Sequence, residues 1–179
     1  GLDGPRAIFG HAIHMSEHDF AHCHHSGCTL AHCPTSNLFL GSGAFRLFDA
    51  LKPARPVHVA LGTDIGAGTS LSLLATMGEA YKVSLMAGDT RLCAAQALWL
   101  ATAGAARALH LHDRIGHIAP GMEADLCVMD PNATPLMAQR SARSTTLAER
   151  LFTLMVLGDD RAIKATWVNG QEIYAKTMN

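Results

Sequence analysis

Three residues that can take part in acid-base or metal chemistry stand at or near the ends of short apolar segments. His11 directly follows AIFG, His32 lies within TLAHCP, and Asp64 follows VALGT. In parallel α/β folds, the residues at the carboxyl ends of the strands line the active site. If these segments are successive parallel strands, they present the three side chains toward one face, which favours a site there. Histidine and aspartate in such a place are typical of metal-assisted chemistry.

Other catalytic signatures are missing from the sequence. It contains no G-x-S-x-G elbow, no Walker phosphate loop, no HExxH and no G-x-G-x-x-G after a candidate strand. The H-x-E and P-C-x-x-C patterns of the zinc nucleobase deaminases are also missing. Metal-assisted chemistry by histidine and aspartate at the strand ends is therefore the type of catalysis that remains possible.

Two of the histidine clusters have the His-x-His spacing of a metal site. His22 and His24 lie on a predicted helix, where side chains two residues apart point about 200° from each other and cannot bind one ion. His110 and His112 lie at a predicted helix end. We expect both clusters to be surface residues and not metal ligands.

The predicted elements that position these side chains alternate between strand and helix. Apolar segments at 6–12, 28–33 and 57–61 predict strands, and the last has no polar face, as in a strand buried on both sides. The segments around them predict a helix opened by Ser16 and ended by Gly27, a loop at 35–43, a helical stretch at 44–52, and helices at 71–86 and 91–108 with Thr90 as a cap. This alternation is the signature of a parallel sheet.

The last third of the chain has a different pattern. Residues 124–129 predict a strand and residues 145–160 a helix. Two further strands within 163–175 are joined by Asn169 and Gly170, a strong signal for a type I′ hairpin. We therefore expect a small β element beside the βα region.

Composition restricts the class of protein. Hydrophobic residues make up 49% and charged residues 16% of the chain, which suits a globular domain. The formal charge of -1 comes without basic runs, so we expect no nucleic-acid partner. We find no membrane-spanning stretch and no signal-peptide pattern, and we expect a cytoplasmic protein without a membrane partner. Five cysteines, an odd number, suggest reduced, mostly structural thiols.

Three βα units alone would leave the first and last strands of a sheet with bare edges, which natural sheets avoid. The chain also starts at Gly1 without methionine, immediately before the first predicted strand. We therefore expect residues upstream of this chain, or a partner, to complete the sheet.

Five segments resemble, in order, the second half of the guanine deaminase family within the amidohydrolase superfamily: FGHAIHMS, LAHCPTSNLFLGSG, VALGTDIGAG, LWLATAGAARALHLHDRIGHIAPGMEADLCVMDP and LGDDRAIKATWVNGQ. The resemblance implies an α/β fold that is the C-terminal part of a (β/α)8 TIM-like barrel. Residues 1–112 would hold strands six to eight of the barrel with their helices. Residues 113–179 would add strands to a small β-sandwich, with an intervening helix.

The same resemblance implies hydrolysis of guanine to xanthine and ammonia by a zinc-activated water, with one zinc per complete site and a homodimeric full-length protein. It makes Asp64 a zinc ligand that also contacts the substrate and transfers protons, and His11 the catalytic histidine that positions the water. A bound Zn²⁺ brings the pKa of water to about 7. Ser36 or Asn37 either faces this pocket or only shapes a turn.

The chain departs from the family pattern at its start. The other zinc ligands of the family and its guanine-recognising residues would lie upstream of Gly1, because a complete barrel needs about 250 residues and this chain has 179. We therefore expect the isolated chain to lose zinc and to be inactive. Two alternatives stay open: a non-catalytic half-barrel module that pairs with itself or another chain, and a deaminase for another aminated purine, pterin or triazine.

Overall fold

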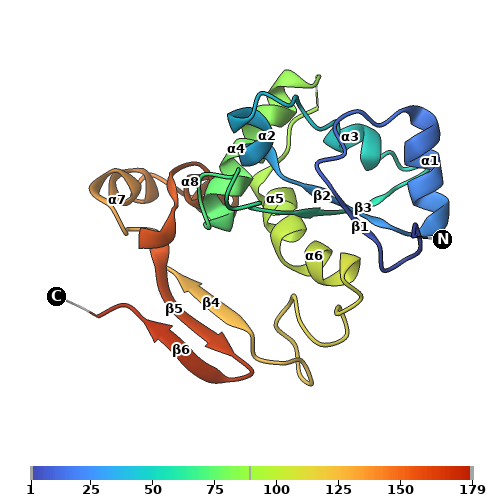
Figure 1. Cartoon of the computed structure of the whole chain (residues 1–179). Coiled ribbons are helices and arrows are strands. Elements are labelled where there is room, and N and C mark those ends of the chain that lie inside the picture. Colours follow the sequence, from blue (N-terminus) through green and yellow to red (C-terminus); the bar gives the residue numbers. More distant parts are fainter. Residues whose placement is uncertain (1, 89, 178–179) are drawn as a thin grey trace.

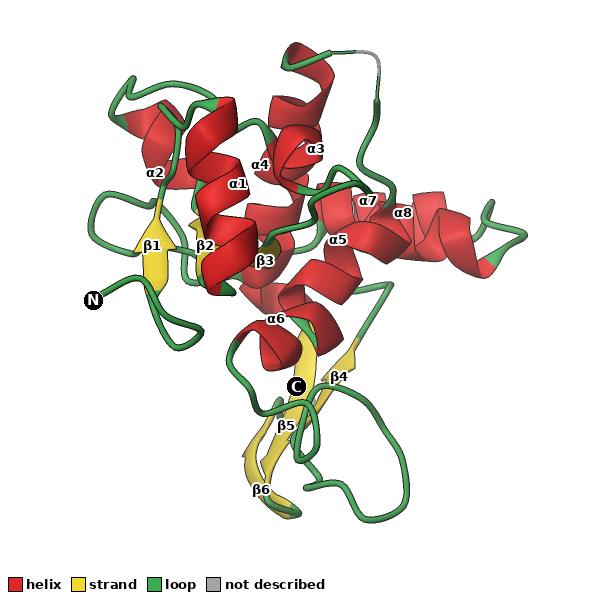
Figure 2. Cartoon of the chain, turned by 90° about the vertical axis from the view of Figure 1, so that its right-hand side faces the viewer, coloured by secondary structure: helices red, strands yellow, loops and turns green. Residues whose placement is uncertain are grey.

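The computed structural model describes residues 2–88 and 90–177, and it has a mixed α/β fold. Its first sheet is parallel, in the order β1 (Ile8–Gly10), β2 (Thr29–His32) and β3 (His58–Leu61). Figures 1 and 2 show this sheet among helices and a second sheet set apart from it, with α6 between the two. The three predicted parallel strands are therefore confirmed.

The two faces of the parallel sheet are covered unequally by the described residues. Val59 and Leu61 are buried on one face, whereas on the other face His58 is exposed and Ala60 is half-buried. Only Thr29, in the central strand, is buried on that second face. The prediction that residues 57–61 are buried on both sides is therefore wrong, because the described ranges leave the face of His58 largely open. The outer strand β1 is exposed along its whole length.

The helix α1 (Glu17–Ser26) begins and ends where the sequence predicts. The Ser16 side chain accepts a hydrogen bond from the backbone of Asp19, and the Asp19 carboxylate accepts one in return, so a capping box is formed. Gly27 ends the helix at φ 71°, a left-handed conformation that glycine adopts at no steric cost.

The loop predicted at 35–43 is wrong in its first half, because α2 (Pro34–Phe39) occupies it. Proline at the first helical position already has the helical φ and needs no amide hydrogen there, so Pro34 ends the strand and also starts a helix. The predicted helical stretch at 44–52 is shorter than expected and forms only α3 (Leu47–Ala50).

The next predicted helix is found as α4 (Leu73–Met86), which is capped by Ser72. The stretch 91–108 forms two helices, α5 (Ala94–Ala101) and α6 (Ala103–Ala108), because the backbone at Thr102 is not helical. The predicted cap Thr90 is also wrong, because Cys93 caps α5. The Cys93 sulfur accepts a hydrogen bond from the backbone N–H of Gln96, and the backbone N–H of Cys93 donates to the Gln96 side chain.

The second sheet is antiparallel and consists of β4 (Leu126–Met129), β5 (Ile163–Val168) and β6 (Gln171–Ala175). Asn169 and Gly170 both have positive φ, 48° and 77°, as a type I′ turn requires, so the predicted hairpin is confirmed. The remaining elements are the predicted helix α8 (Leu147–Leu157), the unpredicted helix α7 (Pro135–Ser141) and a 3₁₀ turn at Asp160–Ala162.

Two features of the described residues bear on the environment of the protein. Within residues 2–88 and 90–177, no helix has both the length and the apolar character that crossing a membrane requires. All five cysteines are free, and Cys23, Cys28 and Cys33 are buried, which agrees with mostly structural thiols.

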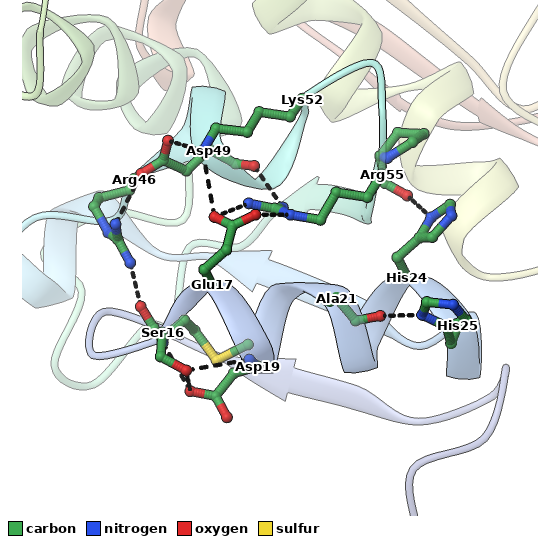
Figure 3. Close-up of polar contacts among 12 residues, drawn as sticks. Ser16, Glu17, Asp19, Ala21, His24, His25, Arg46, Asp49, Lys52 and Arg55 are labelled. Atoms are coloured by element: carbon green, nitrogen blue, oxygen red, sulfur yellow. Dashed lines mark hydrogen bonds and ion pairs between the residues drawn. The ribbon is translucent and has the colours of Figure 1, made fainter.

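An ion-pair network holds the start of α1 against the chain that leads into β3. Figure 3 shows Glu17 between Lys52 and Arg55, and its carboxylate accepts hydrogen bonds from both. Arg55 is only 8% exposed, and its guanidinium carbon lies 5.0 Å from the ring centre of the buried Phe20. Arg55 also donates to the backbone oxygen of Asp49. The network thus links α1, α3 and the approach to β3.

Replacing Glu17 with glutamine should reduce the change in folding stability with pH between about pH 2 and pH 4.5. The hydrogen bond from Arg55 lowers the pKa of Glu17 from 4.5 to about 2. The unfolded chain therefore takes up a proton near pH 4.5 that the folded chain resists, so this stabilisation is complete above pH 4.5 and is lost as pH falls to about 2. We expect Glu17→Gln to lower the midpoint of thermal unfolding at pH 7 but not at pH 2.

The matched control is Glu79→Gln, because Glu79 pairs with Lys82 on the surface of a single helix. Such pairs contribute little to stability, so this variant should unfold close to the wild type at both pH values. An equal effect of the two variants at pH 7 would contradict the role given to Glu17.

Candidate active site

The ends of β1 and β3 bring His11 and Asp64 to the same edge of the parallel sheet. The backbone N–H of His11 donates to the carbonyl oxygen of Ala31 at 3.0 Å, and that of Gly62 donates to His32 at 2.9 Å. These bonds extend the strand pairing by one step and fix where the chain leaves the sheet. His11 Nε2 then lies 3.7 Å from Asp64 Oδ2. Two of the predicted site residues are therefore together.

The backbone at this edge is in an unusual conformation. His11, Ala12 and Asp64 have φ values of 68°, 50° and 49°. These values lie in the left-handed region, which residues other than glycine rarely adopt. Each such residue costs on the order of 1–3 kcal/mol and persists only where its surroundings hold it, most often at functional sites. The strain supports a functional role for this edge.

Asp64 is held by a tight turn that requires glycine. The N–H of Gly68 donates to the carbonyl oxygen of Asp64 at 2.6 Å. A Cβ atom at Gly68 would lie 1.9 Å from the carbonyl oxygen of Thr63, far inside van der Waals contact. Gly68 therefore permits a close return of the backbone toward Thr63 and Asp64.

The His11 and Asp64 side chains are open to solvent, with 46% and 38% of their surfaces exposed. Their 3.7 Å separation is longer than a hydrogen bond, so both retain capacity to bind another group. His11 also lines a cleft that is formed by two loops, together with Ala12, Ile13, His14, Met15, Leu40 and Ser42. An exposed carboxylate beside an imidazole can accept and return a proton at this edge.

The alternatives for Ser36 and Asn37 are resolved by their hydrogen bonds. Asn37, in α2 and 2% exposed, faces His11, with its Oδ1 2.8 Å from His11 Nδ1. Ser36 is buried, and its hydroxyl donates to the backbone oxygen of Cys33. Asn37 thus touches the site, whereas Ser36 stabilises the start of α2.

His32 does not join the other two residues. It ends β2 on the same face as Leu30, is fully buried, and lies with its ring centre 4.9 Å from that of Phe45. Burial lowers the pKa of His32 to about 4, so the ring is neutral at pH 7. The prediction placed His32 within its strand, near the carboxyl end, and expected it to face the site. This orientation is wrong, because strand alternation turns the side chain into the core.

The residues of this edge fit a metal ligand role only in part. The exposed Asp64 carboxylate is a suitable zinc ligand. Cys33 is not, because burial raises the pKa of its thiol and favours the protonated form. Within the described ranges, no group of three or more His, Cys, Asp or Glu side chains is arranged to hold a metal ion. Zinc at Asp64 would therefore need donors from outside these residues.

The predicted location of those donors is the sequence upstream of Gly1, together with the residues that recognise guanine. This prediction concerns residues upstream of this chain, so the structure does not test it. The shortage of donors around Asp64 agrees with it, because a zinc site needs three or four protein ligands. The upstream location of the other site residues therefore stays a prediction.

The two His-x-His clusters lie at the surface, as predicted. His22 pairs with Asp3, with 2.7 Å between Nε2 and Oδ2, and His24 Nδ1 lies 2.7 Å from the backbone oxygen of Pro56. His110 makes a similar contact to Pro5. Each of these three histidines thus has its own partner, and the expectation that the clusters do not bind a metal stays a prediction.

Comparison with known proteins gives a consistent picture. Residues 1–173 match the model of the amidohydrolase family. The chain is 46% identical to the guanine deaminase of Escherichia coli (strain K12) over 98% of its own length and 39% of that protein. It is 30% identical to the guanine deaminase of Homo sapiens over 94% of its length and 38% of that protein. The chain thus spans about two fifths of these curated relatives.

Solved structures agree with the sequence relatives. E. coli guanine deaminase has a TM-score of 0.95 over 99% of this chain and 41% of that one, at 46% identity. An adenosine deaminase from Xanthomonas campestris, with bound zinc, has a TM-score of 0.81 at 32% identity, over 96% of this chain and 38% of that one.

Replacing Gly68 with alanine should disturb the turn that holds Asp64. The new Cβ must displace the Thr63 carbonyl, and overpacking of this kind typically costs about 1–3 kcal/mol. Denaturant unfolding should show this loss. The control is Gly4→Ala, because no atom of the described residues lies within 4 Å of a Cβ at Gly4. Equal stability of Gly68→Ala and Gly4→Ala would contradict the close contact.

Replacing His32 with leucine should flatten the pH dependence of stability between pH 6.5 and 4. Burial lowers the pKa of His32 from 6.5 to about 4, so in this range the unfolded chain binds a proton that the folded chain does not. Stability from this residue is therefore complete above pH 6.5 and falls by about 3 kcal/mol toward pH 4. Denaturant unfolding at several pH values measures the slope, and His18→Gln, at an exposed histidine, should leave it unchanged.

Proposed function

Since this chain belongs to the amidohydrolase family, we propose that it is the C-terminal portion of a guanine deaminase, which hydrolyses guanine to xanthine and ammonia. The observation that carries the proposal is the approach of His11 and Asp64 at the carboxyl edge of a parallel sheet. The 46% identity to E. coli guanine deaminase supports guanine as the substrate.

In this proposal the parallel sheet is part of a (β/α)8 barrel. Strands β1 to β3, within residues 1–112, are barrel strands six to eight, and β4 to β6, within 113–179, belong to a small β-sandwich. The parallel order of the first three strands supports this assignment. The exposed strand β1 and the largely open sheet face also support it, because a closed barrel covers both.

Zinc is the metal that we propose for the complete enzyme, with Asp64 as one ligand and the remaining donors supplied by the rest of the barrel. The exposed carboxylate of Asp64 and the bound zinc in the related X. campestris adenosine deaminase support this choice. A zinc ion in such a site supplies Lewis-acid activation of water at neutral pH.

Asp64 and His11 have different roles in the proposed reaction. Asp64 accepts the proton of the attacking water on a carboxylate oxygen and returns it to the departing amine, so that ammonia leaves as a neutral molecule. His11 holds the attacking water in place by a hydrogen bond. The hydrolysis then consumes one water and exchanges the amino group for oxygen.

A deaminase for another aminated heterocycle is the second candidate, because the adenosine deaminase from X. campestris is also similar to this chain. Ammonia release from guanine, adenine, pterins and aminotriazines separates the two. A homodimer and a cytoplasmic location remain predictions. A mass measurement in solution tests the first, and the same measurement on the isolated chain tests the non-catalytic module.

The full-length enzyme that contains this chain should release ammonia from guanine and hold about one zinc per chain. Asp64→Asn should lower kcat by about 10²–10⁴-fold, because it removes the proton acceptor, and should also lower the zinc content. The isolated chain should release no ammonia. Ammonia and zinc assays on the purified proteins measure these effects.

The control is Asp113→Asn, which changes an exposed carboxylate outside the candidate site. It should retain the activity and the zinc of the wild type. A wild-type enzyme without guanine turnover would falsify the proposed function, and full activity of Asp64→Asn would remove Asp64 from the mechanism.

A further inference from the structure

We propose that Asn37 is a positioning residue that fixes the tautomer and the ring orientation of His11. The proposal rests on the proposed function and adds a residue to it. The basis is the 2.8 Å contact between Asn37 Oδ1 and His11 Nδ1. An amide oxygen can only accept a hydrogen bond, so His11 must carry its proton on Nδ1.

The protonated Nδ1 determines what the other nitrogen can do. With Nδ1–H bonded to Asn37, a neutral ring presents the lone pair of Nε2, and Nε2 is the atom that lies 3.7 Å from the Asp64 carboxylate. His11 therefore accepts a proton or a hydrogen bond at Nε2, facing the reacting groups. A ring with the opposite tautomer would donate there instead.

Asn37 is itself held firmly enough to act as a template. Its side chain is buried, its backbone N–H donates to Cys33, and its backbone oxygen accepts from Ser42. His11, in contrast, is half-exposed and lies in a left-handed turn. The buried partner thus orients the exposed one.

The energetics also favour a positioning role over a structural one. Within the described residues, the Asn37 amide nitrogen is buried without a hydrogen-bond partner, and burial of an unpaired amide group is costly. Leucine has a similar shape and no polar atoms to satisfy, so folding alone would not select asparagine. The hydrogen bond to His11 is the one described interaction of this side chain that accounts for it.

Two variants of the full-length enzyme separate the effect of the hydrogen-bond acceptor of Asn37 from the effect of the shape of its side chain. Asn37→Asp keeps an acceptor oxygen at the same place, whereas Asn37→Leu keeps the approximate shape and removes it. The tautomer of His11 can be read from ¹⁵N chemical shifts of histidine-labelled protein, with His11→Gln used to assign the signal. Thr35→Val is the control, because Thr35 lies on the same helix with a buried, unpartnered hydroxyl.

We expect the wild type, Asn37→Asp and Thr35→Val to keep the His11 proton on Nδ1, and Asn37→Leu to lose this preference. Asn37→Leu should fold as stably as the wild type and should lose about 10–100-fold in kcat, as is typical when the partner of a site histidine is removed. KM for guanine and zinc content should change little.

Three results would overturn the proposal. The first is a wild-type His11 without a proton on Nδ1, because the Asn37 amide would then be turned around. The second is an unchanged tautomer in Asn37→Leu, and the third is a loss of the tautomer in Asn37→Asp. Each is a spectroscopic result that holds whether or not the enzyme deaminates guanine, so it is distinct from a failure of the proposed function.

Discussion

Two backbone hydrogen bonds at the ends of the strands determine where the candidate site can form. The N–H groups of His11 and Gly62 donate to β2, which lies between β1 and β3. Both outer strands are therefore anchored to the same strand up to the point where they leave the sheet. Beyond that point the backbone turns into the left-handed region at His11 and Asp64, and the two side chains approach each other across the end of β2.

Several destabilising features lie at the carboxyl edge of the parallel sheet, and the interactions that offset their cost in folding free energy lie elsewhere in the structure. Three left-handed residues and the buried amide of Asn37 lie at the carboxyl ends of the strands. The core beneath them contains well-packed apolar side chains such as Phe20, Leu30 and Val59, and α1 and α8 begin with complete capping boxes. Among the described residues, His110 and Asn169 are also left-handed, but the three at this edge occur together, which is typical of a site that is shaped for chemistry.

The sequence predicted the features that depend on local signals. Apolar segments located the three parallel strands, the Ser16 capping box located α1, and Asn169 with Gly170 located the hairpin. The helix α2 was missed because its six residues, of which the first is Pro34, are too few to show a helical period. The sequence left open whether Ser36 or Asn37 faces the pocket, since the contact of Asn37 with His11 joins residues that are 26 positions apart in the chain. His32 was grouped with the site because its place near the end of a strand does not show toward which face its side chain points.

The open face of the parallel sheet links the stability of the fold to the completion of the metal site. Parallel sheets are normally covered on both faces, yet His58 on one face and Ile8 on the outer strand are exposed among the described residues. The edge that carries His11 and Asp64 borders this same sheet, and Asp64 alone cannot hold a metal ion tightly. In the proposed barrel, the strands that cover the open face also bring the missing donors toward Asp64. Completion of the core and completion of the metal site are then one event, so metal binding and folding of this region should be thermodynamically coupled.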